Sequence, residues 1–224
     1  MSWRTEPDTL ILDYDGTLHD CLRIYAPAFR TVWGELEAAG LNPPPEVSDA
    51  RVRSWLGLSV QGMWDDFMPQ LEPEVQSRYG ARIGEEMFRL VQAGEAALYP
   101  GAEDALDALR LAGHHLVFLS NCPHDYMEAH RQHFRLDRWF DGYLCSGDYP
   151  GKAKWEIYKA ARESFPGRHL VIGDRWSDME IATVFQLPSI GCLYGYGVPE
   201  ELEDAAICIA DISELPQAVS TLLP

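Results

Sequence analysis

The chain has 224 residues, of which 46% are hydrophobic and 24% charged, and these proportions predict a globular protein with a proper core and room for a modest second domain. Its formal net charge of −17 would repel nucleic acid and anionic membrane surfaces, so we expect neither as a partner. The same charge repels phosphorylated ligands, which would therefore need a local positive site.

The start of the chain lacks the charged and apolar segments of a signal peptide, and no apolar stretch approaches the ~20 residues needed to cross a bilayer. The five cysteines do not pair evenly and show no Cys-x-x-Cys spacing, which favours a reducing compartment. His130 and His133 have no cysteine or acidic triad at ligand spacing, so we predict no zinc site. We expect a cytoplasmic protein.

The first predicted strand is the apolar run Thr9–Leu12, and the sequence Asp-Tyr-Asp-Gly-Thr follows it at 13–17. Side chains alternate along a strand, so Asp13 and Asp15 are expected on one side, and Gly16 lets the chain leave the sheet sharply. Crowded carboxylates resist joint ionisation unless a cation neutralises them. The pair therefore indicates either a Mg²⁺ site or a raised pKa suited to acid–base chemistry, the alternative being an ordinary Asp-Gly turn.

Some eighty residues without a convincing strand come next. Apolar residues recur there at helical spacing, first at Ile24, Phe29, Val32, Trp33 and Leu36, and later at Ile83, Met87, Leu90 and Val91. This pattern predicts a helical insertion between linkers near 19–20 and 98–101.

Beyond the insertion, helices alternate with apolar strand candidates at 115–121, 142–146, 169–174, 188–193 and 206–210. Alternation of this kind is typical of an α/β fold with a doubly wound, Rossmann-like parallel sheet.

Polar residues follow two of these later strands, as they follow the first. Ser120 and Asn121 end one strand, and Asp174 to Asp178 follow another. The carboxyl ends of parallel strands meet along one edge, so these segments should converge there, together with the loop 151–154 that opens a helix at 155–164. Each also has a purely structural explanation: Ser and Asn cap helices, and a capping box on Ser177 would place Asp178 in a first helical turn.

Four segments follow one another along the chain: 13–17, Ser120-Asn121, Lys152 and 173–178. They stand in the order of the four motifs of the haloacid dehalogenase superfamily, which the chain resembles over most of its length. The segments 99–102 and 193–197 look like those of its phosphoglycolate phosphatase branch. The resemblance implies an all-α cap of the C1 type at 21–96, inserted into a discontinuous catalytic core at 1–20 and 97–224.

The resemblance also implies a mechanism. Asp13 would be the nucleophile that forms an aspartyl-phosphate, and Asp15 the general acid and base. Mg²⁺ would be held by the carboxylates of Asp13 and Asp174 and by the backbone carbonyl of Asp15, with Asp178 supporting this set from outside. The metal would neutralise the charge that otherwise stops an anion from attacking an anion.

Phosphate binding would fall to Ser120, Asn121 and Lys152. The prolines that usually follow this lysine in the family are replaced by Ala153 and Lys154, so Lys154 remains an alternative to Lys152. The cap contains no lysine, which leaves Arg51 and Arg53 as candidates for binding the non-reacting end of the substrate.

We expect a phosphatase acting on a small phosphorylated metabolite, such as phosphoglycolate or a sugar phosphate. The second Asp of the pair argues against a dehalogenase, and the lysine-free cap argues against a phosphonate hydrolase. A sugar phosphomutase of the same family is the alternative. A non-catalytic phospho-acceptor or metabolite-binding protein is the alternative from another class.

Overall fold

The computed structural model describes residues 7–224. The chain divides into two compact units, one that runs to Asp20 and resumes at Leu98, and one that comprises Cys21–Ala97. The first is an α/β unit and the second is entirely helical.

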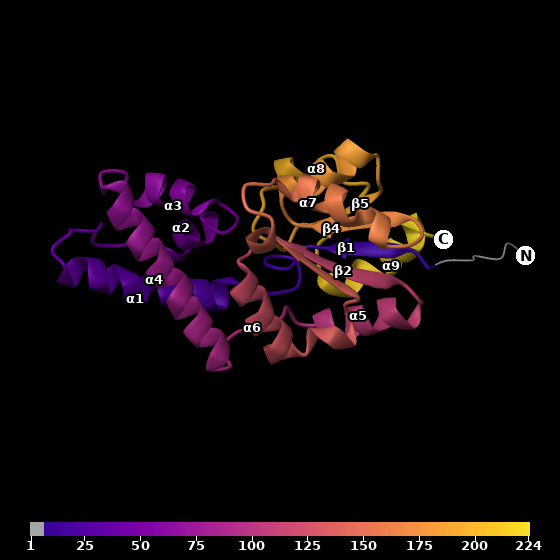
Figure 1. The fold of residues 1–224 in the computed structure, drawn as a ribbon, viewed down its shortest axis with the longest axis horizontal. Coiled ribbons are helices and arrows are strands. Elements are labelled where there is room, and N and C mark those ends of the chain that lie inside the picture. The colour runs from indigo at the N-terminus through magenta and orange to yellow at the C-terminus, as the bar shows by residue number, and fades with distance from the viewer. Residues whose placement is uncertain (1–6) are drawn as a thin grey trace, which may run out of the picture. The chain divides into compact units, whose positions relative to one another are not determined.

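Within residues 7–224 the α/β unit contains one sheet of six strands in the order β3-β2-β1-β4-β5-β6, and every neighbouring pair is parallel. The predicted doubly wound parallel sheet is therefore confirmed (Figure 1). The strands are β1 (Thr9–Leu12), β2 (His115–Ser120), β3 (Gly142–Cys145), β4 (His169–Gly173), β5 (Ser189–Cys192) and β6 (Ile207–Ile209).

Helices cover both faces of this sheet, with α7 and α8 on one face and α5 and α9 on the other (Figure 1). The helices of the unit are α5 (Ala102–Leu111), α6 (His124–Phe134), α7 (Lys154–Ala161), α8 (Trp176–Phe185) and α9 (Leu215–Leu222). Short 3₁₀ turns lie at Leu136–Arg138, Ser146–Asp148, Arg162–Ser164, Pro199–Leu202 and Ile212–Glu214.

The core follows from the continuous apolar character of the strands. Residues of β1 to β4 pack against α7 and α8 in one cluster, made of Ile11, Val117, Leu119, Leu144, Ile157, Tyr158, Val171, Ile181 and Ala182. The alternate strand residues, such as Leu10, Phe118 and Ile172, are fully buried too. A strand that is buried on both sides needs helices on both faces, as observed.

The register of the sheet decides which residues emerge together at its carboxyl edge. Leu12 is paired with Phe118 on one side and with Ile172 on the other, and the amide of Asp13 donates to the carbonyl of Ile172 (2.9 Å). The chain therefore leaves β1 between the ends of β2 and β4.

The helical unit contains α1 (Leu22–Ala38), α2 (Asp49–Ser54), α3 (Val60–Phe67) and α4 (Pro73–Gln92). The predicted spacing of apolar residues is reflected in its core, where Ile24, Phe29, Val32 and Leu36 of α1 are buried. The Phe29 ring lies 4.9 Å from the Trp55 ring and 5.0 Å from the Phe67 ring, measured between centroids. Aromatic packing thus joins α1 to the segments around α2 and α3.

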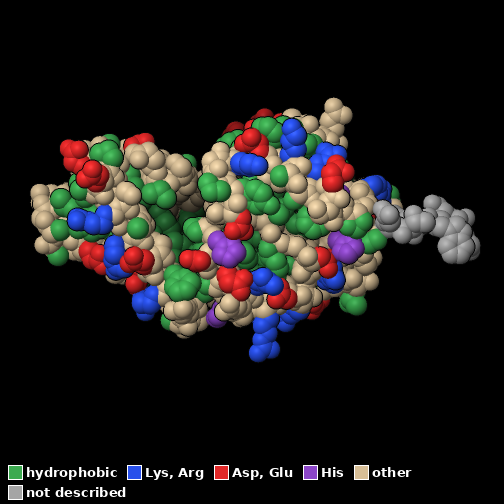
Figure 2. All heavy atoms as spheres, viewed as in Figure 1, with side chains coloured by type: hydrophobic (Ala, Val, Ile, Leu, Met, Phe, Trp, Pro, Cys, Tyr) green, Lys and Arg blue, Asp and Glu red, His purple; other side chains and the backbone are tan. Residues whose placement is uncertain are grey.

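None of the helices in residues 7–224 combines the length and the apolar character required to cross a membrane. On the face shown in Figure 2, Lys and Arg side chains are scattered among Asp and Glu side chains and do not form a continuous basic patch.

Substitution of Phe118 tests how strongly the sheet core stabilises the fold. Phe118 is fully buried and its ring lies 4.9 Å from that of Tyr14, so Phe118→Ala should lower the free energy of unfolding by about 3–5 kcal/mol. Leu111→Ala is the matched control, because Leu111 is 89% exposed and its loss should cost about 0.5 kcal/mol or less. Urea denaturation followed by circular dichroism measures both, and equal losses would contradict this view of the core.

Candidate active site

Three aspartates from separate segments meet at the carboxyl edge of the sheet. Asp13 follows β1, Asp174 follows β4, and Asp178 lies in the first turn of α8. One side-chain oxygen from each lies within 4.8 Å of the others, and all three residues are less than 9% exposed. The edge is where the parallel strands were expected to bring these residues together.

A buried lysine lies within this carboxylate cluster. The Nζ of Lys154 is 2.6 Å from Asp13 Oδ1 and 2.6 Å from Asp178 Oδ1. Burial lowers the pKa of Lys154, but the charges of Asp13 and Asp178 raise it further, so the net pKa lies above its usual range and the side chain is an ammonium ion.

Lys152, the predicted phosphate-binding residue, lies elsewhere. Its side chain is exposed, with Nζ 5.7 Å from the centroid of the Tyr149 ring. The structure therefore brings Lys154 to the cluster and not Lys152. The reason is local: α7 begins at Lys154, after Ala153 whose amide is bound by the Glu156 carboxylate (2.9 Å), and position 152 stays in the preceding turn.

The cluster holds more negative than positive charge. Burial and the neighbouring Asp178 raise the pKa of Asp13 well above its usual range, although Lys154 opposes the shift. The same two causes raise the pKa of Asp174 to about 6. Three carboxylates share one ammonium ion, so a further cation would relieve their repulsion. Their donors are all oxygens, which is the ligand type that Mg²⁺ prefers, and the residues present therefore fit this metal.

Asp174 is fixed by groups from two other segments. Thr17 Oγ1 donates to Asp174 Oδ1 (3.1 Å) and the amide of Tyr196 donates to Oδ2 (2.7 Å). Gly16 has a φ of 89°, and a Cβ there would lie 2.3 Å from Asp174 Oδ2, so only glycine fits this approach. Tyr194 donates in turn to the carbonyl of Thr17 (2.9 Å).

Asp178 has two hydrogen-bond partners, the lysine of the carboxylate cluster and a backbone amide at the start of α8. Its Oδ1 accepts from Lys154 and its Oδ2 accepts from the amide of Arg175 (3.1 Å). The prediction of a capping box on Ser177 is wrong, because α8 begins at Trp176 and the capping carboxylate is that of Asp178 itself. This satisfies an amide at the helix start and is favoured by the helix dipole.

Asp15 lies in a different environment from Asp13. Its Oδ1 is 2.7 Å from His19 Nδ1 and accepts from the Tyr126 hydroxyl at 2.9 Å. Burial raises the pKa of Asp15, but the hydrogen bond to His19 and the other contacts lower it more, so the net pKa lies below its usual value. The expected crowding of Asp13 by Asp15 is thus replaced by crowding from Asp174 and Asp178, because β1 ends at Leu12 and strand alternation does not extend to Asp15.

A buried aromatic layer supports this second environment. The Tyr14 hydroxyl is 2.8 Å from His130 Nδ1, and the rings of His19 and His130 are 4.5 Å apart. Burial lowers the pKa of His130 to about 3, so this side chain is neutral. The layer packs α6 against the loop that follows β1 and fixes the ring that contacts Asp15.

The remaining predicted residues are placed as follows. Ser120 is buried at the end of β2, next to β1, and the exposed Asn121 follows it. Arg51 and Arg53 lie on α2 of the helical unit. Arg51 binds Asp66 within that unit, through Nε to Oδ2 (3.1 Å) and Nη2 to the backbone carbonyl (2.6 Å), while the Arg53 side chain is exposed.

Sequence reasoning missed several residues of this site. Thr17 belongs to the first motif but had no assigned role, and Tyr196 was noted only as part of a family-like tail. His19 lies only four residues after Asp15, and this short spacing could have indicated their contact. Tyr126 is more than a hundred residues from Asp15, and no spacing pattern could have paired the two.

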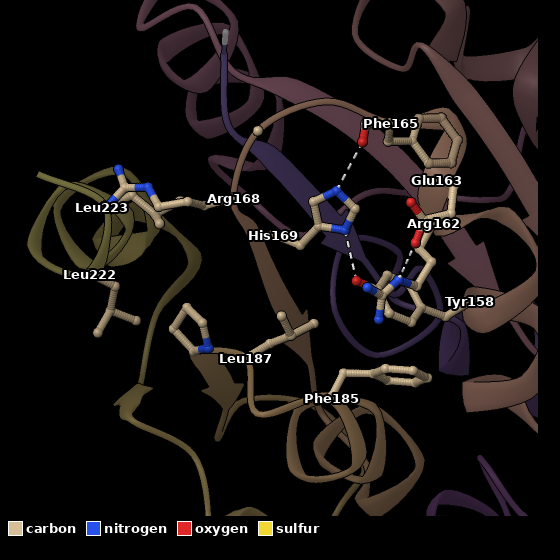
Figure 3. A pocket seen from close by; sticks show the side chains of 12 residues that line it. Tyr158, Arg162, Glu163, Phe165, Arg168, His169, Phe185, Leu187, Leu222 and Leu223 are labelled. Carbon is tan, nitrogen blue, oxygen red and sulfur yellow. Dashed lines mark hydrogen bonds and ion pairs between the residues drawn. The ribbon is translucent and has the colours of Figure 1, made fainter. Parts of the chain in front are cut away.

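A cavity of about 460 Å³ lies at the other end of β4, beside its first residue, His169 (Figure 3). Its polar groups already have partners: His169 contacts Tyr158 and the carbonyl of Phe165, and Arg162 contacts Glu163. The aspartates do not line it, so we do not assign the chemistry to this cavity.

The family model of haloacid dehalogenase-like hydrolases matches residues 7–184. Phosphoglycolate phosphatase of Pseudomonas syringae pv. syringae (strain B728a) is 26% identical over 222 residues, which cover 93% of this chain and 78% of the relative.

Solved structures share the fold. A predicted phosphatase from Clostridium acetobutylicum superposes with a TM-score of 0.78 at 23% identity, over 97% of this chain and 100% of that one. CbbY from Rhodobacter sphaeroides, in complex with xylulose-(1,5)bisphosphate, gives 0.72 at 22% identity, over 92% and 95%. The chain therefore belongs to the haloacid dehalogenase-like hydrolases and is an enzyme of their phosphatase type, similar to phosphoglycolate phosphatases.

Proposed function

We propose that this protein is a Mg²⁺-dependent phosphatase that hydrolyses a small phosphorylated metabolite through an aspartyl-phosphate on Asp13. The observation that carries the proposal is the buried group of three carboxylates around the Lys154 ammonium ion at the carboxyl edge of the sheet. Such a group concentrates a nucleophile and compensating positive charge at one point, which is what attack on a phosphate anion requires.

In the first step an oxygen of Asp13 attacks phosphorus, and the bond from phosphorus to the leaving oxygen breaks. Asp15 gives its proton to that oxygen. In the second step Asp15 takes a proton from water, the water oxygen attacks phosphorus, and the Asp13 carboxylate leaves. The low pKa of Asp15 keeps its carboxylate ionised and able to accept the proton from water in the second step. A phosphate dianion beside Asp15 raises this pKa, which allows Asp15 to carry the proton that it donates in the first step.

The other residues of the site would orient the nucleophile, bind the phosphoryl group and neutralise its charge. Lys154 orients Asp13 and balances its charge. The Ser120 hydroxyl and the backbone amides around Asn121 donate to the phosphoryl oxygens. The carboxylates of Asp13 and Asp174 and the carbonyl of Asp15 would hold Mg²⁺, which supplies Lewis-acid neutralisation of the phosphate. Asp178 keeps Lys154 in place.

We further propose that the helical unit acts as the cap that selects the substrate, with a substrate such as phosphoglycolate or a sugar phosphate. Two phosphate-related relatives support this class: a phosphoglycolate phosphatase and a protein bound to a sugar bisphosphate. Arg51 and Arg53 of α2 are the candidates for binding the non-reacting end, because the cap contains no lysine and a guanidinium suits a second anionic group.

Substitution of the nucleophile tests the function itself. Asp13→Asn should lower kcat on phosphoglycolate or the best sugar phosphate by more than about 10³-fold, because the amide cannot attack phosphorus. Asp104→Asn, an exposed position on α5, is the matched control and should keep full activity. Release of inorganic phosphate, measured colorimetrically, separates hydrolysis from phosphomutase activity, and its loss on addition of EDTA tests the need for Mg²⁺. Undiminished turnover by Asp13→Asn would refute the mechanism.

The acid role of Asp15 predicts a dependence on the leaving group. Asp15→Asn should slow hydrolysis of an alkyl phosphate far more than that of p-nitrophenyl phosphate, whose phenolate leaves with little protonation. Tyr126→Phe removes one hydrogen bond to Asp15 and should show the same bias more weakly, by roughly 10-fold. The ratio of kcat/KM for the two substrates is the measurement. Equal losses on both substrates would exclude an acid role.

Substitution of Lys154 and of Lys152 tests which of the two lysines serves the active site. Lys154→Ala leaves buried carboxylates without their partner and should lower the free energy of unfolding by about 3–5 kcal/mol as well as abolish most activity. Lys152→Ala should change stability by about 0.5 kcal/mol or less, since its side chain is exposed. Thermal denaturation and kcat/KM are measured on both variants. A larger loss of activity in Lys152→Ala would return the phosphate-binding role to that residue.

A further inference from the structure

A further group of side chains with potential metal-ligand atoms lies beside the end of β2 and is formed by His124, Cys145 and Asp148. His124 Nδ1 is 2.9 Å from Asp148 Oδ1, and Cys145 Sγ donates to Asp148 Oδ2 at 3.3 Å. One ligand atom from each residue lies within 4.8 Å of the others. The group contains a nitrogen, a sulfur and an oxygen donor, unlike the oxygen-only set around Asp13.

The fold holds these residues together through two loops. Cys145 ends β3 opposite Ser120 of β2, so the segments after both strands are neighbours. The carbonyl of Cys122 accepts from the Gly147 amide (3.1 Å) and from the Ser146 hydroxyl (3.2 Å). A Cβ at Gly147 would lie 2.4 Å from the His124 amide nitrogen, so glycine permits this close approach.

The distances suit a small ion with tetrahedral coordination. Zn²⁺ binds imidazole nitrogen and carboxylate oxygen at about 2.0–2.1 Å and thiolate sulfur at about 2.3 Å, which places neighbouring ligand atoms roughly 3.3–3.6 Å apart. The observed contacts with the Asp148 carboxylate, 2.9 Å from His124 Nδ1 and 3.3 Å from Cys145 Sγ, are close to these values. Mixed nitrogen and sulfur donors favour Zn²⁺ over Mg²⁺.

The exposure of these side chains is also compatible with metal binding. The side chains of His124 and Asp148 are 54% and 43% exposed, so an ion can reach them from solvent, whereas Cys145 is buried beneath. The thiolate is the form of cysteine that binds metal, so metal binding would release the proton that Cys145 donates to Asp148.

Although sequence spacing alone predicts no zinc site, we propose that His124, Cys145 and Asp148 bind one Zn²⁺ ion, with water in the fourth position, at a site separate from the aspartate cluster. Bound metal joins the segment after β2 to the segment after β3. That junction directly follows Ser120 and Asn121, so the site is placed to stiffen the loop to which we assign phosphate binding.

Cobalt is the probe that separates the two sites. Co²⁺ is titrated into the full-length reduced protein while excess Mg²⁺ occupies the oxygen-only cluster, with a phosphine reductant that carries no thiol. Binding at the proposed site gives a thiolate-to-Co²⁺ charge-transfer band, which a site made only of carboxylates and water cannot produce. The expected stoichiometry is one Co²⁺ per chain, displaced by one Zn²⁺.

Variants then assign the band to residues. Cys145→Ser should remove the charge-transfer band, and His124→Gln and Asp148→Asn, which alter exposed side chains, should each weaken Co²⁺ affinity by at least about 100-fold. His115→Gln is the matched control, since His115 forms a similar pair with Asp141 (2.9 Å) but without a cysteine. Cys208→Ser controls for the exposed thiol. Both controls should bind Co²⁺ as the wild type does.

Two results would overturn the proposal. One is the absence of a charge-transfer band in the wild type, or its loss in Cys208→Ser and not in Cys145→Ser. The other is wild-type Co²⁺ affinity in both His124→Gln and Asp148→Asn. Either result is independent of phosphatase activity, so it leaves the proposed function untouched.

Discussion

The candidate active site of this protein depends on the ion pairs that the Lys154 ammonium ion forms with Asp13 and Asp178. The ammonium ion lies within 2.6 Å of both Asp13 and Asp178, and all three groups are buried. A buried carboxylate without a partner is strongly destabilising, and this edge contains three. The lysine makes the grouping tolerable and still leaves it short of positive charge. The remaining negative charge would favour binding of a further cation at this site.

Around this centre, the fold separates two carboxylates that are only two residues apart. Burial and neighbouring carboxylates raise the pKa of Asp13, whereas contacts with His19 and Tyr126 leave the pKa of Asp15 below its usual value. Opposite environments of this kind are how one scaffold gives two identical side chains different roles. The separation arises because β1 ends at Leu12, so strand alternation does not place Asp15 beside Asp13, and Asp15 instead contacts Tyr126 of α6.

The segment after β2 serves two neighbouring groups of residues. Its first part, Ser120 and Asn121, stands beside the Asp13 centre in the order of the strands, and its next part contacts the loop after β3 through Cys122. The donors differ in kind, with oxygens at one group and nitrogen, sulfur and oxygen at the other. The two proposed sites would therefore prefer different metals.

The sequence by itself determined the parallel sheet, the strands within one or two residues, and the meeting of Asp13, Asp174 and Asp178, because apolar runs and their polar ends are local patterns and parallel strands share one edge. The tertiary structure alone decided that Lys154 and not Lys152 enters the cluster, since this depends on where α7 begins. It alone joined Tyr126 to Asp15 and His124 to Cys145 and Asp148. These contacts arise from the packing of helices and loops, and no local pattern along the chain encodes which distant side chains will touch.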